Sequence, residues 1–204
     1  MTTVQEFAIQ QITGGCSTAG LKGLNIQILA LLREALPNGL VSCEQSVQIV
    51  GGSTLPLLQP AANAALIEAV ADKGEKPKLV HAYRTVAHQV VLHQWFNKGK
   101  KCGVKLAAPT GSSPHEKGIA IDIQEHTRWI KVLKKHGWKW RGQADPPHFT
   151  FIGGGISTNV LKESVRAFQK LWNLHNPGDR IKEDGIFGQT ETAPRLLKSP
   201  IDGF

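Results

Sequence analysis

Apolar residues in the first hundred positions recur three and four apart, as they do on one face of a helix. This spacing predicts helices over residues 24–36, 60–70 and 85–97, and a Pro-Asn-Gly turn at 37–39 ends the first of them. Between the second and third helices, residues 78–84 predict a short strand. In the third helix the side chains expected to face the core are Val86, Val90, Trp95 and Phe96.

The middle of the chain changes to strict alternation, which is the pattern of a half-buried strand. Residues 119–123 read Ile-Ala-Ile-Asp-Ile, which puts three isoleucines on one face and Asp122 on the other. Residues 148–151 read His-Phe-Thr-Phe, which puts both phenylalanines on one face and His148 on the other. A predicted helix over 128–136 lies between them. Strands mixed with helices outside strict βαβ order predict an α+β domain.

The C-terminal quarter returns to helical spacing. A Gly-Gly-Gly run at 153–155 predicts a flexible hinge, so a domain boundary is expected near 153–157. Residues 159–174 predict an amphipathic helix, 184–188 a glycine turn, and 190–197 a short final helix. The apolar positions of the amphipathic helix are Val165, Phe168, Leu171 and Trp172.

The net charge narrows the classes of partner. The 204 residues carry 24 lysines and arginines against 16 acidic residues, a formal charge of +8. A basic surface favours polyanions such as nucleic acid, anionic lipid or wall polymers, although such a charge also serves solubility alone. The basic run at 98–101 is short and lacks the aromatic platforms of a single-stranded nucleic-acid channel, so no nucleic-acid partner is expected.

Hydropathy and cysteine usage exclude other classes. The longest apolar stretches, such as 26–32, are far shorter than the ~20 residues of a membrane span, so none is expected. Residues 1–11 lack the basic and apolar regions of a secretory signal. The three cysteines Cys16, Cys43 and Cys102 form no Cys-x-x-Cys pair, and they predict buried residues or free thiols rather than a disulfide framework.

Reactive side chains gather in two segments, residues 113–122 and 145–149. If the two predicted strands are neighbours in one sheet, Asp122 and His148 converge on the same face. His115, in the preceding loop, can reach the same point. Two imidazoles and one carboxylate, with a position left open for water, are typical of a catalytic zinc site. We therefore predict Zn²⁺ as the cofactor, with these three residues as its ligands.

Asp145 lies three residues before His148, in a loop stiffened by Pro146 and Pro147. A carboxylate held there can take a proton from an activated water and deliver it to a leaving amine. Either His/Asp spacing alone is more common in hydrogen-bonded structural pairs, so it is the combination that indicates chemistry. The other histidines, His81 among them, have no partner at ligand spacing and are expected to be structural.

The combined pattern resembles the zinc D-alanyl-D-alanine carboxypeptidases and their relatives, the L-alanyl-D-glutamate endopeptidases of phage lysins. The resemblance covers roughly residues 54–152. It is carried by Ser113, His115, Gly118, Ala120, Asp122, Asp145, His148 and Phe149, with Tyr83, Arg84, Thr85 and Gln89 upstream. It implies a zinc metallopeptidase that hydrolyses peptide bonds in the stems of bacterial peptidoglycan, outside the cytoplasm.

The resemblance also implies roles for single residues. It gives the same three zinc ligands, and it puts Asp145 in the general-base position. Arg84 is expected to contact the substrate carbonyl or carboxylate and to steady the developing oxyanion. Ser113 and Gln89 are expected substrate contacts, although a loop-capping role explains Ser113 equally well.

Two alternatives remain for the stem-peptide bond that is cleaved. Carboxypeptidase-type members usually have Glu where this chain has Asp145, whereas the endopeptidases usually have Asp in a Trp-rich context such as residues 138–142. Residues 107–115, however, are more similar to the corresponding segment of the carboxypeptidases. The leading expectation is therefore a D-Ala-D-Ala carboxypeptidase-like enzyme, with an L-alanyl-D-glutamate endopeptidase as the alternative.

The C-terminal segment is similar to the small three-helix peptidoglycan-binding domain, through Val165, Phe168, Gln169, Asp184, Gly185, Gly188 and Thr190. The resemblance implies a wall anchor that raises the effective concentration of the enzyme near its substrate. The expected organisation is a zinc peptidase domain over 1–152, with a core at about 54–152 and an extension over 1–53 of no assigned role, and a peptidoglycan-binding domain over 157–204. The expected fold class is α+β: a small antiparallel sheet with helices holds the zinc site, beside a small C-terminal three-helix module. A monomer is expected.

Two other hypotheses come from different classes. A wall-binding protein with a vestigial zinc site would bind insoluble peptidoglycan without releasing amino groups. A nucleic-acid binder would show an affinity for DNA that falls steeply with salt. The chemically competent residues at all five candidate catalytic positions favour the enzyme. Because the substrate lies outside the cytoplasm and no secretory signal is visible, holin-assisted release and a separate leader both stay open as export routes.

Overall fold

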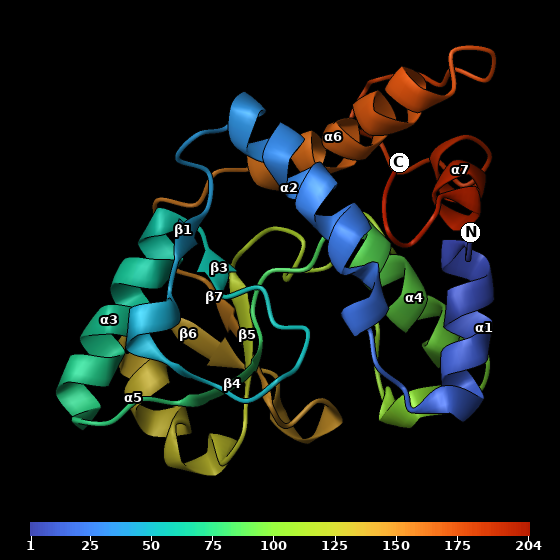
Figure 1. Ribbon diagram of the computed structural model, residues 1–204. Coiled ribbons are helices and arrows are strands. Elements are labelled where there is room, and N and C mark those ends of the chain that lie inside the picture. The colour runs from blue at the N-terminus through green and yellow to red at the C-terminus, as the bar shows by residue number, and fades with distance from the viewer.

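A five-stranded sheet in the order β2-β4-β5-β7-β6 lies at the centre of a computed structural model that describes residues 1–204 (Figure 1). Its strands are β2 (Gln48–Ile49), β4 (Lys78–His81), β5 (Ala120–Ile123), β6 (Trp138–Trp140) and β7 (His148–Phe151). The sheet is mixed rather than purely antiparallel, because β2 runs parallel to β4 while all other pairs are antiparallel. A second, two-stranded antiparallel sheet pairs β1 (Val41–Ser42) with β3 (Leu57–Leu58). The predicted α+β class is confirmed.

The chain also forms seven helices: α1 (Val4–Gly14), α2 (Lys22–Ala35), α3 (Pro60–Lys73), α4 (Val86–Asn97), α5 (Ile130–Lys135), α6 (Asn159–His175) and α7 (Thr192–Lys198). Six of them lie where helical spacing predicts them. Their ends follow local chemistry: Thr85 caps α4 by accepting a hydrogen bond from the His88 N–H at 3.2 Å, and α3 ends at the left-handed Gly74. The additional helix, α1, begins with a capping box between Thr3 and Glu6.

One hydrophobic core lies between the sheet and the helices α3 and α5, which cover one of its faces (Figure 1). The alternating residues enter this core as predicted, since Ile119, Ile121 and Ile123 are buried in it together with Phe149 and Phe151. Asp122 and His148 alternate with these residues, so their side chains leave the opposite face of the sheet. The face that carries the candidate chemistry is therefore turned away from α3 and α5.

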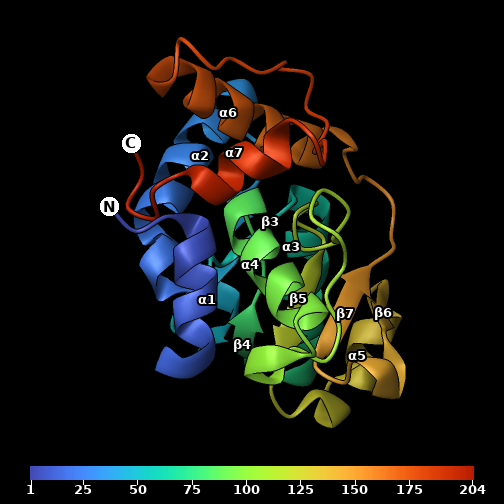
Figure 2. The same ribbon diagram turned by 90° about the vertical axis from the view of Figure 1, so that its right-hand side faces the viewer.

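A second core joins the two ends of the chain. It is built by α1, α2, α4, α6 and α7, and α2 crosses α6 and packs against it (Figures 1 and 2). The predicted apolar face of α6 is buried there. At the chain ends, the Val4 N–H donates to the Ser199 carbonyl at 2.9 Å, and Thr3 forms a β-bridge with Pro200.

The C-terminal segment 157–204 contains two helices rather than the three expected of a small separate module. Residues 176–191 between them form no helix and are held instead by polar contacts. Gln169 receives a hydrogen bond from the Gly185 N–H at 2.8 Å and donates to the Ile186 carbonyl at 3.1 Å. The further helices that pack on this segment come from the N-terminal part of the chain.

The expectation that no cysteine is disulfide-bonded is wrong for two of the three. Cys16 and Cys102 form a disulfide across 86 positions of sequence, and Cys43 is free and buried. The pairing arises because α1 and α4 lie side by side and bring the segments that follow them together (Figures 1 and 2). No helix has the length and apolar character needed to cross a membrane.

Candidate metal centre and its cleft

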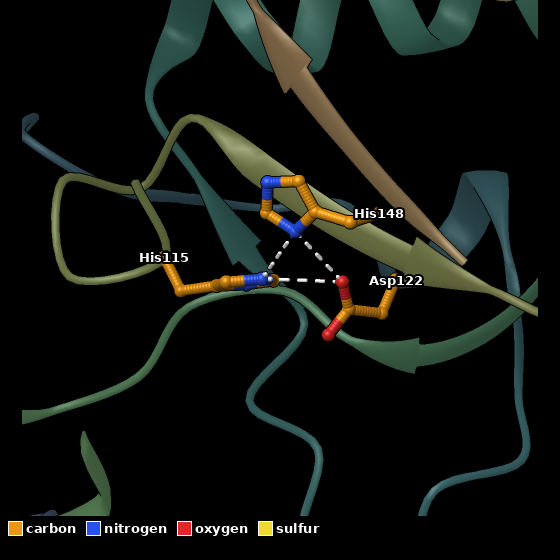
Figure 3. A group of neighbouring side chains, drawn as sticks. All are labelled: His115, Asp122 and His148. Atoms are coloured by element: carbon orange, nitrogen blue, oxygen red, sulfur yellow. Dashed lines mark hydrogen bonds and ion pairs between the residues drawn. The ribbon is translucent and has the colours of Figure 1, made fainter. Parts of the chain in front are cut away.

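The register of the central sheet brings two of the predicted ligands face to face. Asp122 on β5 and His148 on β7 are direct cross-strand partners in the antiparallel pair. His115 reaches them from a turn that precedes β5, and this turn is tied to the Arg84 N–H by a hydrogen bond of 3.3 Å to the His115 carbonyl. All three side chains are buried, and they point toward one another in Figure 3.

The three ligand atoms form a nearly equilateral triangle (Figure 3). His115 Nε2 lies 3.1 Å from His148 Nδ1 and 3.2 Å from Asp122 Oδ1, and the third edge, from His148 Nδ1 to Asp122 Oδ1, is 3.0 Å. A tetrahedral zinc site with bonds of about 2.0 Å has ligand atoms roughly 3.3 Å apart. The spacing therefore fits three corners of a zinc tetrahedron.

Hydrogen bonds on the outer ring atoms orient both imidazoles. His115 Nδ1 lies 2.6 Å from the Ala82 carbonyl, which only accepts, so this nitrogen carries the proton and Nε2 presents its lone pair to the cluster. His148 Nε2 lies 2.9 Å from the Thr150 hydroxyl, which leaves Nδ1 facing inward. Burial, followed by the charge of Arg84, lowers the pKa of His115 to about 4, so this imidazole is neutral at pH 7. Two ring nitrogens turned inward beside a carboxylate fit a divalent cation.

The second oxygen of Asp122 faces two cationic or basic side chains. Arg84 donates to Asp122 Oδ2 at 2.6 Å, and His81 Nδ1 lies 3.5 Å from the same oxygen. Burial alone would raise the pKa of Asp122, but His115 and Arg84 hold it well below its usual range. His81 lies outside the three-residue cluster, as expected, but it contacts the second oxygen of Asp122 from the side of β4.

Asp145 lies in the wall of a cleft of about 760 Å³ that also contains Arg84, Ser113 and the three clustered residues. The side chain is half-buried and makes no hydrogen bond to a protein group. Partial burial, together with the negative charge of Asp122, raises the pKa of the Asp145 carboxyl. A carboxylate with a raised pKa beside an open site is suited to proton transfer.

Ser113 lines the same cleft, and its hydroxyl accepts a hydrogen bond from the His115 N–H at 3.3 Å. Gln89 is not among the residues that line the cleft. It is fully buried, and its Nε2 donates to the carbonyl of Ala108 at 2.9 Å, so it holds a cleft-lining residue from behind.

Glu116 is a buried site residue that the sequence patterns do not single out. Its carboxylate accepts hydrogen bonds from the backbone N–H groups of Gly111, Ser112 and Ser113 at 3.0 to 3.2 Å. Burial raises its pKa to about 7 although these three donors favour the charged form. The signal for this role is a carboxylate close to a Gly-Ser-Ser turn, whose N–H groups have no strand or helix partner.

An open cluster of two imidazoles and a carboxylate in a cleft is characteristic of metal-dependent hydrolases. Within that class, residues 58–144 match the family model VanY, described as a D-alanyl-D-alanine carboxypeptidase. The matched segment includes Arg84, His115 and Asp122, and His148 lies just beyond its end. No curated protein matches the chain. The match supports a D-alanyl-D-alanine carboxypeptidase-like peptidase for this part of the chain.

Proposed function

We propose that this protein is a zinc metallopeptidase that removes the terminal residue from D-Ala-D-Ala stems of bacterial peptidoglycan. The observation that carries the proposal is the triangle of His115, Asp122 and His148 in an open cleft, within and directly after a segment similar to carboxypeptidases of this class. The ligand atoms, their orientation and their spacing all suit zinc.

These three side chains would hold the ion, and a bound zinc ion would supply a Lewis acid and lower the pKa of a coordinated water to about 7. Asp145 is the proposed general base. From the cleft wall it accepts the proton of the attacking water and later donates it to the leaving amine. Its raised pKa supports this role, because a base that is too acidic passes its proton on with ease but accepts it poorly.

Arg84 is proposed to bind the substrate oxygen that gains negative charge. Its guanidinium is mostly buried and makes a single side-chain hydrogen bond, to Asp122, so other donors stay free for a substrate carbonyl or carboxylate. Ser113 is proposed to position the substrate at the same wall. We propose that Gln89 acts indirectly, through the Ala108 carbonyl that it holds.

The C-terminal segment is proposed to bind the wall polymer. Gln169 organises the turn at 184–188, in which Ile186 remains 65% exposed at the surface. The enzyme is proposed to work outside the cytoplasm, and the Cys16–Cys102 disulfide supports this, because such bonds persist in oxidising compartments. Peptidoglycan is the proposed partner.

A second candidate, an L-alanyl-D-glutamate endopeptidase, rests on Asp145 itself. The carboxypeptidases that this chain resembles usually have the longer glutamate at this position, and the endopeptidases usually have aspartate. The two activities differ in the product that they release from the same stem.

Mass spectrometry of purified muropeptides after incubation with the zinc-loaded protein tests the proposal. The expected product is a stem shortened by one alanine, and a fragment that begins at D-glutamate would favour the endopeptidase. His148→Ala should abolish product, and Asp145→Asn should slow its formation by about 10²- to 10⁴-fold. Thr13→Val, an exposed change outside the cleft, should leave product formation intact. Full activity of His148→Ala would refute the metal-dependent mechanism.

A further inference from the structure

The cleft extends well beyond the metal cluster, onto a wall that comes from the N-terminal segment. Residues 16–18 and 51–53 line it together with the loop at 145–148. The volume of about 760 Å³ lies in the upper part of the range of roughly 300–1,000 Å³ found for sites of drug-sized ligands. Such ligands are several times larger than the two alanines that flank the scissile bond, so the cleft has room for a longer substrate.

Covalent and hydrogen bonds hold this wall in place. The Cys16–Cys102 disulfide ties the chain after α1 to the chain after α4, and both cysteines line the cleft. Next to it, the Thr18 hydroxyl lies 2.6 Å from the Ser53 hydroxyl and 3.0 Å from His88 Nε2, and Thr18 is 95% buried. A preorganised wall loses little conformational freedom when it binds a ligand.

The chemistry of the lining favours an acidic peptide. The wall itself offers hydroxyls and the backbone of two glycines, which suit peptide hydrogen bonds. The cleft as a whole contains the cations Arg84, Lys105 and Arg141 against the two carboxylates Asp122 and Asp145. Since Asp122 is already neutralised by Arg84 or by a metal, the remaining field favours a substrate that carries carboxylates.

We propose that Thr18, Gly52 and Ser53 form a subsite for the residues of an acidic stem peptide upstream of the scissile bond. A carboxypeptidase releases one residue, so the long remainder of the substrate lies on the other side of the metal cluster and meets this wall. The N-terminal segment then determines specificity for stems of several residues over a bare dipeptide. This inference rests on the proposed function.

A single substitution can fill the subsite without disturbing the fold. A side chain at Gly52 would meet no atom within 4 Å at its Cβ, and its backbone is not left-handed, so Gly52→Phe projects into open space. Gly154→Phe is the matched control, because Gly154 has the same freedom and lies outside both the cleft and the C-terminal segment. The substrates are a stem pentapeptide and N-acetyl-D-Ala-D-Ala, which share the scissile bond.

Wild-type protein is expected to prefer the pentapeptide. Gly52→Phe should raise KM for the pentapeptide about tenfold or more with little change in kcat, which is the pattern of lost ground-state binding. Its kinetic constants for the dipeptide should equal those of the wild type. The control variant should match the wild type on both substrates. The double variant Cys16→Ser, Cys102→Ser should also lower kcat/KM for the pentapeptide selectively, because the wall is no longer anchored. Equal effects on both substrates, or no effect on either, would overturn the subsite.

The subsite and the proposed function can fail separately. If wild-type protein cleaves neither substrate, the proposed function is wrong, and calorimetric titration of the zinc-loaded protein with the pentapeptide then decides the subsite. The subsite is supported if Gly52→Phe weakens the binding of the pentapeptide and Gly154→Phe does not. Binding that is absent, or equal in all three proteins, would overturn it.

Discussion

Replacing Thr150 with valine should weaken zinc binding while leaving the fold intact. The Thr150 hydroxyl lies 2.9 Å from His148 Nε2 and is that ring atom's only protein partner. Thr150 sits inside β7, where it pairs with Ala120 on one side and Lys139 on the other. Valine has the same shape and is favoured in strands, so the substitution removes a hydrogen bond and little else.

Two estimates bound the effect. Loss of a group that orients a metal-bound histidine typically costs 10- to 100-fold in metal affinity, which corresponds to about 1.4–2.7 kcal/mol. A neutral hydrogen bond contributes about 0.5–1.5 kcal/mol net. Because the Thr150 side chain is only half-buried, water can replace part of the contact, and the lower end applies. We expect zinc affinity to fall about tenfold.

Competition with a chromophoric chelator measures this affinity directly. Thr150→Ser keeps the hydroxyl and is the matched control, so it should bind zinc nearly as tightly as the wild type. Urea denaturation of the metal-free proteins shows whether the fold is retained. If Thr150→Val binds zinc as tightly as wild type, or if Thr150→Ser is equally weak, then the hydroxyl does not orient His148.

Three further predictions concern thiols, pH and the general base. Cys16 and Cys102 are paired, and Cys43 is 1% exposed with a pKa raised to about 12 by burial. Thiol titration should therefore find no reactive thiol in the native protein, one after denaturation, and three after denaturation with reduction. Two or more reactive thiols in the native protein would contradict the pairing. Burial raises the pKa of Glu116 from 4.5 to about 7. Protonated Glu116 therefore stabilises the folded state fully below pH 4.5, and this stabilisation is lost as the pH rises through 7. Glu116→Gln, measured by urea denaturation of metal-free protein, should therefore gain roughly 2–3 kcal/mol relative to wild type between pH 5 and pH 8, and an unchanged difference would show that Glu116 ionises normally. Asp145→Asn should lower kcat by about 10²- to 10⁴-fold with zinc affinity unchanged, and a variant that loses zinc instead would make Asp145 a ligand.

Period-two alternation is enough to predict where the candidate site lies on the sheet. It puts Asp122 and His148 on the face opposite the isoleucines and phenylalanines, and this follows because burial of one face leaves the other for polar groups. Their meeting also needs β5 and β7 to be neighbours, which the alternation cannot show and which the register supplies. That these residues bind zinc stays a prediction.

Contacts between distant segments could not be predicted from local patterns. The disulfide joins residues 86 positions apart, and the wall formed by Thr18 and Ser53 depends on how α1 and α2 pack against α4. The link between Arg84 and Asp122 likewise depends on the pairing of β4 with β5. Spacing in sequence carries no information about such pairs, because the chain between them sets no fixed distance.

The packing of α2 against α6 has a consequence for cleavage of the chain. The glycine run at 153–155 separates the segments in sequence, but it does not separate them in space, because Gln59 also exchanges two hydrogen bonds with the backbone of Ser157, at 2.7 and 2.9 Å. A protease that nicks the glycine run would therefore leave two fragments that stay associated as a complex. Each fragment alone would expose the apolar helix face that the other covers, so neither is expected to remain soluble without its counterpart.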